Sequence, residues 1–162
     1  MKLKLWGLLA AVVFSTTFTA CDSKNGGASA VSPAVFQLRM VTEVAAGDCD
    51  CDDMVVVSGA GPKETLHVLH PVLLDGTDLK EAWLINDNPG HPQIALLFTA
   101  HGAKRLAEVT RDSIGKRLAM IIDGKLYSAP VIQAEISNGG AVIAGSFNEQ
   151  EAKELVAKLD GR

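Results

Sequence analysis

Aromatic residues are scarce in this chain and make up 5% of its 162 residues, whereas hydrophobic residues as a group make up 48%. Aliphatic side chains must therefore build most of the core. A chain of this length can bury a sizeable core in one domain and still carry extensions. The composition thus predicts a single globular domain.

The patterns that mark common classes of enzyme are also missing. The sequence contains no nucleophile elbow, no histidine in the context of a triad, and no carboxylate pair in a pattern typical of a cleft. Residues 58–63, SGAGPK, contain glycines and a lysine without the spacing of a phosphate-binding loop. We therefore expect a protein that is not an enzyme and that uses no cofactor.

Positive charge is not in excess, since the formal net charge is −4. Removal of residues 1–20, which contain two lysines and no acidic residue, would change this charge to −6. An acidic protein lacks the electrostatic footprint of nucleic-acid binding, so we expect no nucleic-acid partner. The basic side chains between residues 104 and 117 are interpreted as the solvated face of a helix.

No hydrophobic run approaches the roughly 20 residues that a membrane-spanning helix needs. The apolar run at residues 5–14 follows two lysines and precedes small residues and Cys21, an order typical of an export signal. Phe18-Thr19-Ala20-Cys21 resembles a bacterial lipobox, although Phe18 stands where an aliphatic residue is usual. We expect residues 1–20 to be a lipoprotein signal peptide and Cys21 to carry acyl chains such as palmitate. A soluble secreted protein is the alternative.

The residues after Cys21 indicate a location in the bacterial cell envelope. Asp22 resembles a signal that keeps lipoproteins in the inner membrane of Gram-negative bacteria. Residues 21–34 are rich in Gly, Ser and Ala without periodicity, which predicts a flexible tether for a domain at 35–162. Acyl chains, at about 0.8 kcal/mol per buried CH₂, would hold this domain at the periplasmic face of the membrane.

Alternation of apolar and polar residues predicts a half-buried strand at residues 35–44. Phe36, Leu38 and Met40 would share one face, and Gln37 and Arg39 the other.

Two cysteines remain once Cys21 is assigned to lipid. Cys49 and Cys51 lie in an acidic segment, residues 45–53, ahead of a short strand expected at 54–57. Three interpretations are open: a solvated acidic turn with a local disulfide, a redox-sensitive pair, and a metal site that adds neighbouring aspartates. No Cys-x₂-Cys or His pair is near in sequence, so Cys49 and Cys51 are weak metal candidates.

Residues 66–74 are apolar and include His67 and His70. On a strand this spacing places the two histidines on opposite faces, so they cannot ligate one ion. We expect them to be surface or partly buried histidines.

The remaining chain combines short strands with two helices. One helix begins after the capping residue Thr99 and ends at Gly115, and the other begins at Asn148, with Glu151 completing a capping pair. This order predicts an α+β fold with a small, mostly antiparallel or mixed sheet and two amphipathic helices packed on one face. Strands are expected at residues 81–86, 93–99, 131–136 and 142–147.

Residues 118–128 predict a β-hairpin at the structural centre of the domain. Asp123-Gly124 lies between apolar segments, and a type I′ turn requires positive φ at both central positions. Pro130 removes a backbone donor and should end the return strand.

Residues 73–159 contain the strings LLDGTDLKEA, LLFTAHGAKRLAEVTRDSIGKRLAMIIDGKLYSAPVIQ and GSFNEQEAKELVAKL. These strings are similar to the head subdomain of the first periplasmic domain of SecD, a subunit of the bacterial protein-export machinery. His101 stands where this family commonly has an acidic residue, and Leu106 where it commonly has Phe. The resemblance implies a non-enzymatic module that binds polypeptide. Because the chain stops at Arg162 without the family's transmembrane helices, we do not expect the proton-driven motor role.

The hairpin and the residues after it supply the candidate contacts for a partner, which we expect to be polypeptide or a component of the export machinery. A half-buried strand residue is the plainer interpretation of Tyr127. One alternative is an envelope lipoprotein that reuses the fold for an unrelated partner. Another is a thiol- or metal-responsive module built on Cys49 and Cys51. The candidate contacts are Asp123, Gly124, Lys125, Tyr127 and Gln133.

Overall fold

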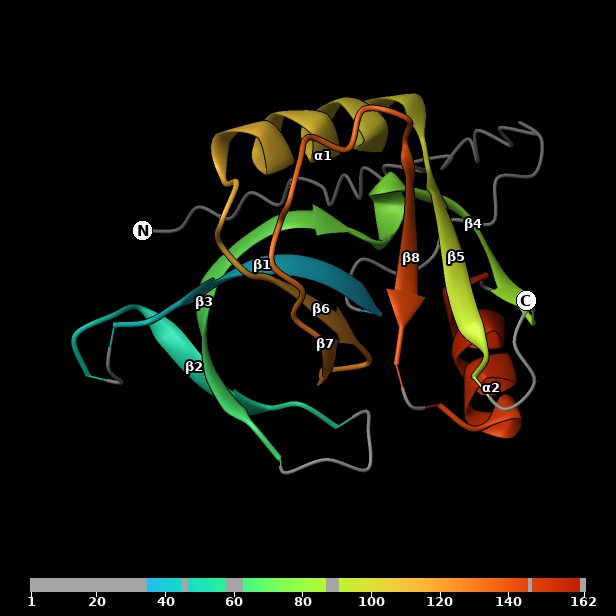
Figure 1. The fold of residues 1–162 in the computed structure, drawn as a ribbon, viewed down its shortest axis with the longest axis horizontal. Coiled ribbons are helices and arrows are strands. Elements are labelled where there is room, and N and C mark those ends of the chain that lie inside the picture. The colour runs from blue at the N-terminus through green and yellow to red at the C-terminus, as the bar shows by residue number, and fades with distance from the viewer. Residues whose placement is uncertain (1–34, 45–46, 58–62, 87–90, 146, 161–162) are drawn as a thin grey trace, which may run out of the picture.

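The computed structural model describes residues 35–160 apart from 45–46, 58–62, 87–90 and 146. The expected signal peptide, Cys21, the tether and most of the 58–63 loop lie outside the described residues. The described part of the chain contains eight strands, two α-helices and one 3₁₀ helix, η1 (Gly76–Asp78). The strands form two antiparallel sheets (Figure 1).

The larger sheet has five strands and curls until its edges approach each other. Val56, directly after the second strand, forms a bridge with Leu126, and the Val57 N–H donates to the Leu126 carbonyl at 2.8 Å. Figure 1 shows the resulting ring of strands. The order in the sheet is β2 (Cys51–Val55), β3 (Thr65–Asp75), β1 (Phe36–Thr42), β6 (Leu118–Ile122) and β7 (Lys125–Ser128).

The smaller sheet has the order β4 (Leu79–Ile85), β5 (Gln93–Phe98) and β8 (Gly140–Ala144). Helix α2 (Glu149–Leu159) contacts β4 and β5, whereas α1 (Ala100–Asp112) contacts β3, η1 and β5. The prediction of a fold with antiparallel strand pairing and two helices is confirmed. The prediction of a single sheet is wrong, since β1 pairs with β3 and β6 in one sheet while β4, β5 and β8 form another. The pairing of β1 joins strands that are distant in sequence, and no local pattern specifies such a pairing.

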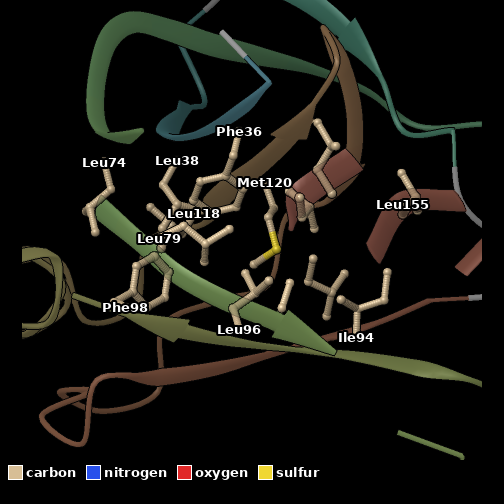
Figure 2. Close-up of a cluster of buried hydrophobic side chains, with 14 of the residues drawn as sticks. Phe36, Leu38, Leu74, Leu79, Ile94, Leu96, Phe98, Leu118, Met120 and Leu155 are labelled. Carbon is tan, nitrogen blue, oxygen red and sulfur yellow. The ribbon is translucent and has the colours of Figure 1, made fainter. Parts of the chain in front are cut away.

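Two hydrophobic cores lie on opposite faces of the five-stranded sheet. In the larger core, side chains of β6 such as Met120 meet side chains of β5 such as Leu96 (Figure 2). The smaller core fills the inside of the curl. Strand β6 is buried along its whole length because Leu118, Met120 and Ile122 face the larger core, while Ala119 and Ile121 face the smaller one.

Local signals at the helix starts and at the hairpin turn are confirmed. The Thr99 hydroxyl accepts the Gly102 N–H at 3.1 Å, and Asn148 forms a capping box with Glu151. Asp123 and Gly124 have φ values of 53° and 73°, as a type I′ turn requires.

The prediction of a strand at residues 131–136 is wrong. Ile132 exchanges backbone hydrogen bonds with the loop after α1, and the Ile136 N–H donates to the Thr110 hydroxyl at 2.9 Å. The backbone groups of Ile132 and Ile136 thus find hydrogen-bond partners although the segment belongs to neither sheet.

Two predicted strand boundaries also move. β2 begins at Cys51 and not at Met54, so Asp52 and Asp53 belong to the strand. β8 spans Gly140–Ala144 in place of residues 142–147, and Phe147 enters the core beyond the strand end.

Arg39 is 8% exposed, although alternation placed it on a polar face. Its Nε donates to the Leu69 carbonyl at 2.5 Å, and its guanidinium contacts the Asp52 carboxylate at 3.0 Å. The alternation is right, but the curl of the sheet covers the second face of β1 as well.

Candidate functional site

The tip of the β6–β7 hairpin places Asp123, Gly124 and Lys125 together at the surface. An ion pair of 2.6 Å joins Asp123 to Lys158 near the end of α2. Their hydrogen bond lowers the pKa of Asp123 and raises the pKa of Lys158. Both side chains are about half exposed, so water screens the pair and its contribution is small. Lys125 remains as an exposed cation beside the turn.

Tyr127 belongs to a different environment. It is the extra residue of a β-bulge, because Leu126 pairs with Ile121 and Ser128 pairs with Met120. Its half-buried ring lies 5.9 Å from the ring of Phe147, and burial raises the pKa of its hydroxyl. These contacts give Tyr127 a packing role between the hairpin and the segment before α2.

Gln133 is exposed on the irregular segment after the hairpin. In the described part of the chain, no recorded hydrogen bond or ion pair joins it to the other four candidates. The structure therefore brings three of the five candidates together at the turn and does not gather all five into one site.

A disulfide joins Cys49 and Cys51, with their Cα atoms 5.4 Å apart. Asp50, between them, accepts the His70 N–H at 3.1 Å through its carbonyl, and its carboxylate contacts the His70 ring. The small disulfide loop is thereby attached to β3.

The two histidines of β3 contact aspartates of β2. His67 lies 2.6 Å from Asp53, and His70 lies 3.0 Å from Asp52. Hydrogen bonds, first to Asp52 and then to Asp50, raise the pKa of His70. Hydrogen bonds from His70 and Arg39 lower the pKa of Asp52. Among the residues that the structure describes, no group of three or more His, Cys, Asp or Glu side chains could hold a metal ion.

An apolar groove on the outer face of the three-stranded sheet was not identified from the sequence. Trp83, Ala95 and Val142 are paired across β4, β5 and β8 and form a row on this face. Trp83 is 42% exposed and Val142 is 51% exposed. The groove has a volume of about 630 Å³, and residues 135–138 form a second wall. Alternation did place Trp83 and Ile85 on one side of a strand, but it does not show which side of a sheet faces solvent.

Comparison with known proteins gives consistent matches. The family model described as SecDF, P1 head subdomain, matches residues 53–161. The protein translocase subunit SecDF of Thermus thermophilus is 50% identical over 91 residues, which cover 56% of this chain and 12% of that protein. SecD of Aquifex aeolicus is 33% identical over 133 residues, covering 79% of this chain and 26% of the relative. The chain thus spans about an eighth to a quarter of the length of these relatives.

A solved structure has a similar fold. It is described as a membrane component, SecDF, that enhances protein export. The TM-score is 0.59 at 36% identity, and the match covers 80% of this chain and 63% of that one. Neither helix in the described residues is long and apolar enough to span a bilayer. The match of the family model to residues 53–161 establishes that this chain belongs to the SecDF P1 head subdomain family.

Proposed function

We propose that this chain is a non-enzymatic binding module, held by lipid at the periplasmic face of the bacterial inner membrane, that binds exported polypeptide or a component of the export machinery. The observation that carries the proposal is the 50% identity to a protein translocase subunit over 91 residues. That match relates the chain to protein export. The groove supports binding, because it exposes the apolar side chains of Trp83 and Val142 beside the polar groups of Glu135 and Asn138, as ligand-binding clefts commonly do.

The test is crosslinking in intact cells. A photoreactive side chain at Val142 should capture translocase subunits or exported chains above the level of a second lipoprotein that carries the same group. Capture at background level would end the proposal. Capture of an unrelated envelope protein alone would favour reuse of the fold for a different partner.

Membrane attachment needs its own test. Cys21→Ser should move the protein from the membrane fraction to the soluble fraction, and mass spectrometry of the native N-terminus should find acyl chains on Cys21. An unmodified Cys21 in a chain that still sediments with membranes would exclude lipid as the anchor.

A thiol-responsive module is the second candidate, because the Cys49–Cys51 loop is attached to β3 through Asp50 and His70. Thiol titration should then find the pair reduced under some cellular condition, with a change in partner capture. Identical capture by the Cys49→Ser, Cys51→Ser double variant would remove this candidate, and equilibrium dialysis with zinc would test its metal-binding form.

A further inference from the structure

Strand β8 is an edge strand without the protection that the other described edges carry. Its sequence, GAVIA, contains neither a charged residue nor proline. By contrast, the edge strand β2 carries Asp52 and Asp53, and β4, at the other edge of the same sheet, carries Lys80 and Glu81. Exposed edges are ordinarily blunted by such charges, because unpaired backbone groups recruit other strands.

The hydrogen-bonding pattern shows which backbone groups of β8 are available. The Phe98 N–H donates to the Gly139 carbonyl at 2.9 Å, so Ala141 and Ile143 direct their backbone groups toward β5. Val142 and Ala144 direct theirs away from β5. No described residue pairs with these outward groups.

The Asn138 side chain marks where the available edge begins. Its Oδ1 accepts the N–H of Gly140 at 3.2 Å, which satisfies the outward donor at the start of β8. The available edge therefore runs from Val142 to Ala144 and lies beside the apolar groove.

We propose that β8 binds an extended segment of unfolded polypeptide as a fourth, antiparallel or parallel strand of the smaller sheet. This inference rests on the proposed function and specifies its site. Only an extended backbone matches the spacing of the outward N–H and C=O groups of Val142 and Ala144. Every second side chain of the added strand would continue the row of Trp83, Ala95 and Val142.

Charge favours a polypeptide over a second copy of this chain as the occupant. Glu135 is the one charged residue in the described lining of the groove. Pairing two copies through β8 would bring two such carboxylates and two acidic domains together, at a formal charge of −6 each, because residues 1–34 contribute +2 to the −4 of the whole chain. A segment with alternating apolar side chains and one basic residue complements both the row and Glu135.

The test measures binding of synthetic peptides to the full chain in detergent micelles. The probe is a seven-residue peptide with alternating valine and serine and one lysine, and aspartate replaces the lysine in the matched peptide. Tryptophan emission should shift to the blue on binding, and the shift should be absent in Trp83→Phe. The lysine peptide should bind more tightly than the aspartate peptide.

Two variants separate backbone pairing from side-chain contact. Val142→Pro removes the outward N–H without removing a donor of the β5–β8 ladder, so it should weaken binding by about tenfold. Val142→Thr keeps this N–H and should bind within about threefold of wild type. Equal binding by Val142→Pro and wild type would overturn the proposal.

Modified peptides keep the test decisive if Val142→Pro fails to fold. Two peptides would be N-methylated, one at its odd-numbered residues and the other at its even-numbered residues. Methylation of the N–H groups that face β8 should abolish binding, whereas methylation of the N–H groups that face away should leave it intact. Unchanged binding of both N-methylated peptides would exclude strand addition.

Two further outcomes separate this inference from the proposed function. For this comparison the photoreactive group is placed at Ile85, which also lines the groove. Capture of exported chains in cells that is equal with and without Val142→Pro would retain the function and reject the site. A wild-type dimer that becomes monomeric in Val142→Pro would identify a second copy as the occupant and overturn the proposal.

Discussion

At Gly102, helix propensity and packing have opposite consequences. An added Cβ would lie 2.5 Å from the Asp78 carbonyl oxygen, which is fixed because it accepts the Thr99 N–H at 2.8 Å. Alanine favours a helix interior by about 1 kcal/mol over glycine. Overpacking against backbone costs about 1–3 kcal/mol. The 2.5 Å contact is with backbone, which places the cost at the upper end of this range. We therefore expect Gly102→Ala to lower the free energy of unfolding by about 2 kcal/mol in urea denaturation.

The exposed neighbour Lys104 supplies the control for this prediction. Lys104→Ala should change the free energy of unfolding by less than about 0.5 kcal/mol. A Gly102→Ala protein as stable as wild type would show that α1 moves away from η1 at little cost.

His70 predicts a pH-dependent contribution to stability. Its folded-state pKa is raised, so its contribution is present below about pH 6.5 and is lost as pH rises through the raised pKa. The pKa of Asp52 is lowered, so its contribution is present above about pH 3.8 and is lost as pH falls through the lowered pKa. The His70–Asp52 pair therefore stabilises the contact between β2 and β3 most fully between about pH 3.8 and about pH 6.5.

An Asp52→Asn variant tests this window. The difference in melting temperature between wild type and variant should be larger near pH 5 than near pH 8.5. NMR titration of the His70 ring should also give a lower pKa in the variant than in wild type. An unchanged His70 titration would mean that Asp52 does not hold the histidine in solution.

At the scale of an element, the β6–β7 turn depends on Gly124, whose φ is 73°. A β-branched residue at positive φ costs about 1–2 kcal/mol, so Gly124→Val should destabilise the protein by that amount or more. Gly124→Asn should cost less, because asparagine tolerates this conformation. Equal stability of the two variants, measured by thermal unfolding, would contradict a type I′ turn. If Lys125→Ala folds normally but no longer captures the partner, the turn is also part of the binding site.

The accuracy of sequence-based prediction for each element depends on whether its determinants are local. The Thr99 and Asn148 caps and the Asp123-Gly124 turn depend on neighbouring residues, and all three are confirmed. The segment at 131–136 has strand composition, yet its hydrogen bonds go to the loop after α1 and to Thr110. Those partners are distant in sequence, so composition alone could not reveal them.

At the scale of the whole molecule, the second sheet and the groove were missed for the same reason: both depend on contacts between residues that are distant in sequence. Leu118 to Ile122 was recognisable as an apolar strand, but its burial on both faces follows from the curl of the larger sheet. The exposure of Trp83 follows from which face of the smaller sheet meets the core. In contrast, the turn candidates Asp123, Gly124 and Lys125 are adjacent in sequence, so their proximity was predictable.

The folded domain begins before the segment that matches the family model. The family match starts at residue 53, inside β2, and leaves out β1. Yet β1 lies at the centre of the larger sheet and pairs with both β3 and β6. Its Phe36 and Leu38 side chains are 0% and 1% exposed. Each contributes about 1.5–3 kcal/mol by burial, a large part of the roughly 5–15 kcal/mol that stabilises a typical domain.

We therefore expect a fragment of residues 35–162 to unfold cooperatively on heating and a fragment of residues 53–162 to lack a cooperative transition by circular dichroism. A synthetic peptide of residues 35–44 tests the cause, because it can supply β1 in trans. Adding it to the shorter fragment should restore a transition, whereas the same peptide with Phe36→Asp and Leu38→Asp should not, since two charges would enter the larger core. Cooperative unfolding of residues 53–162 alone would place the start of the domain within β2 and make β1 an accessory strand.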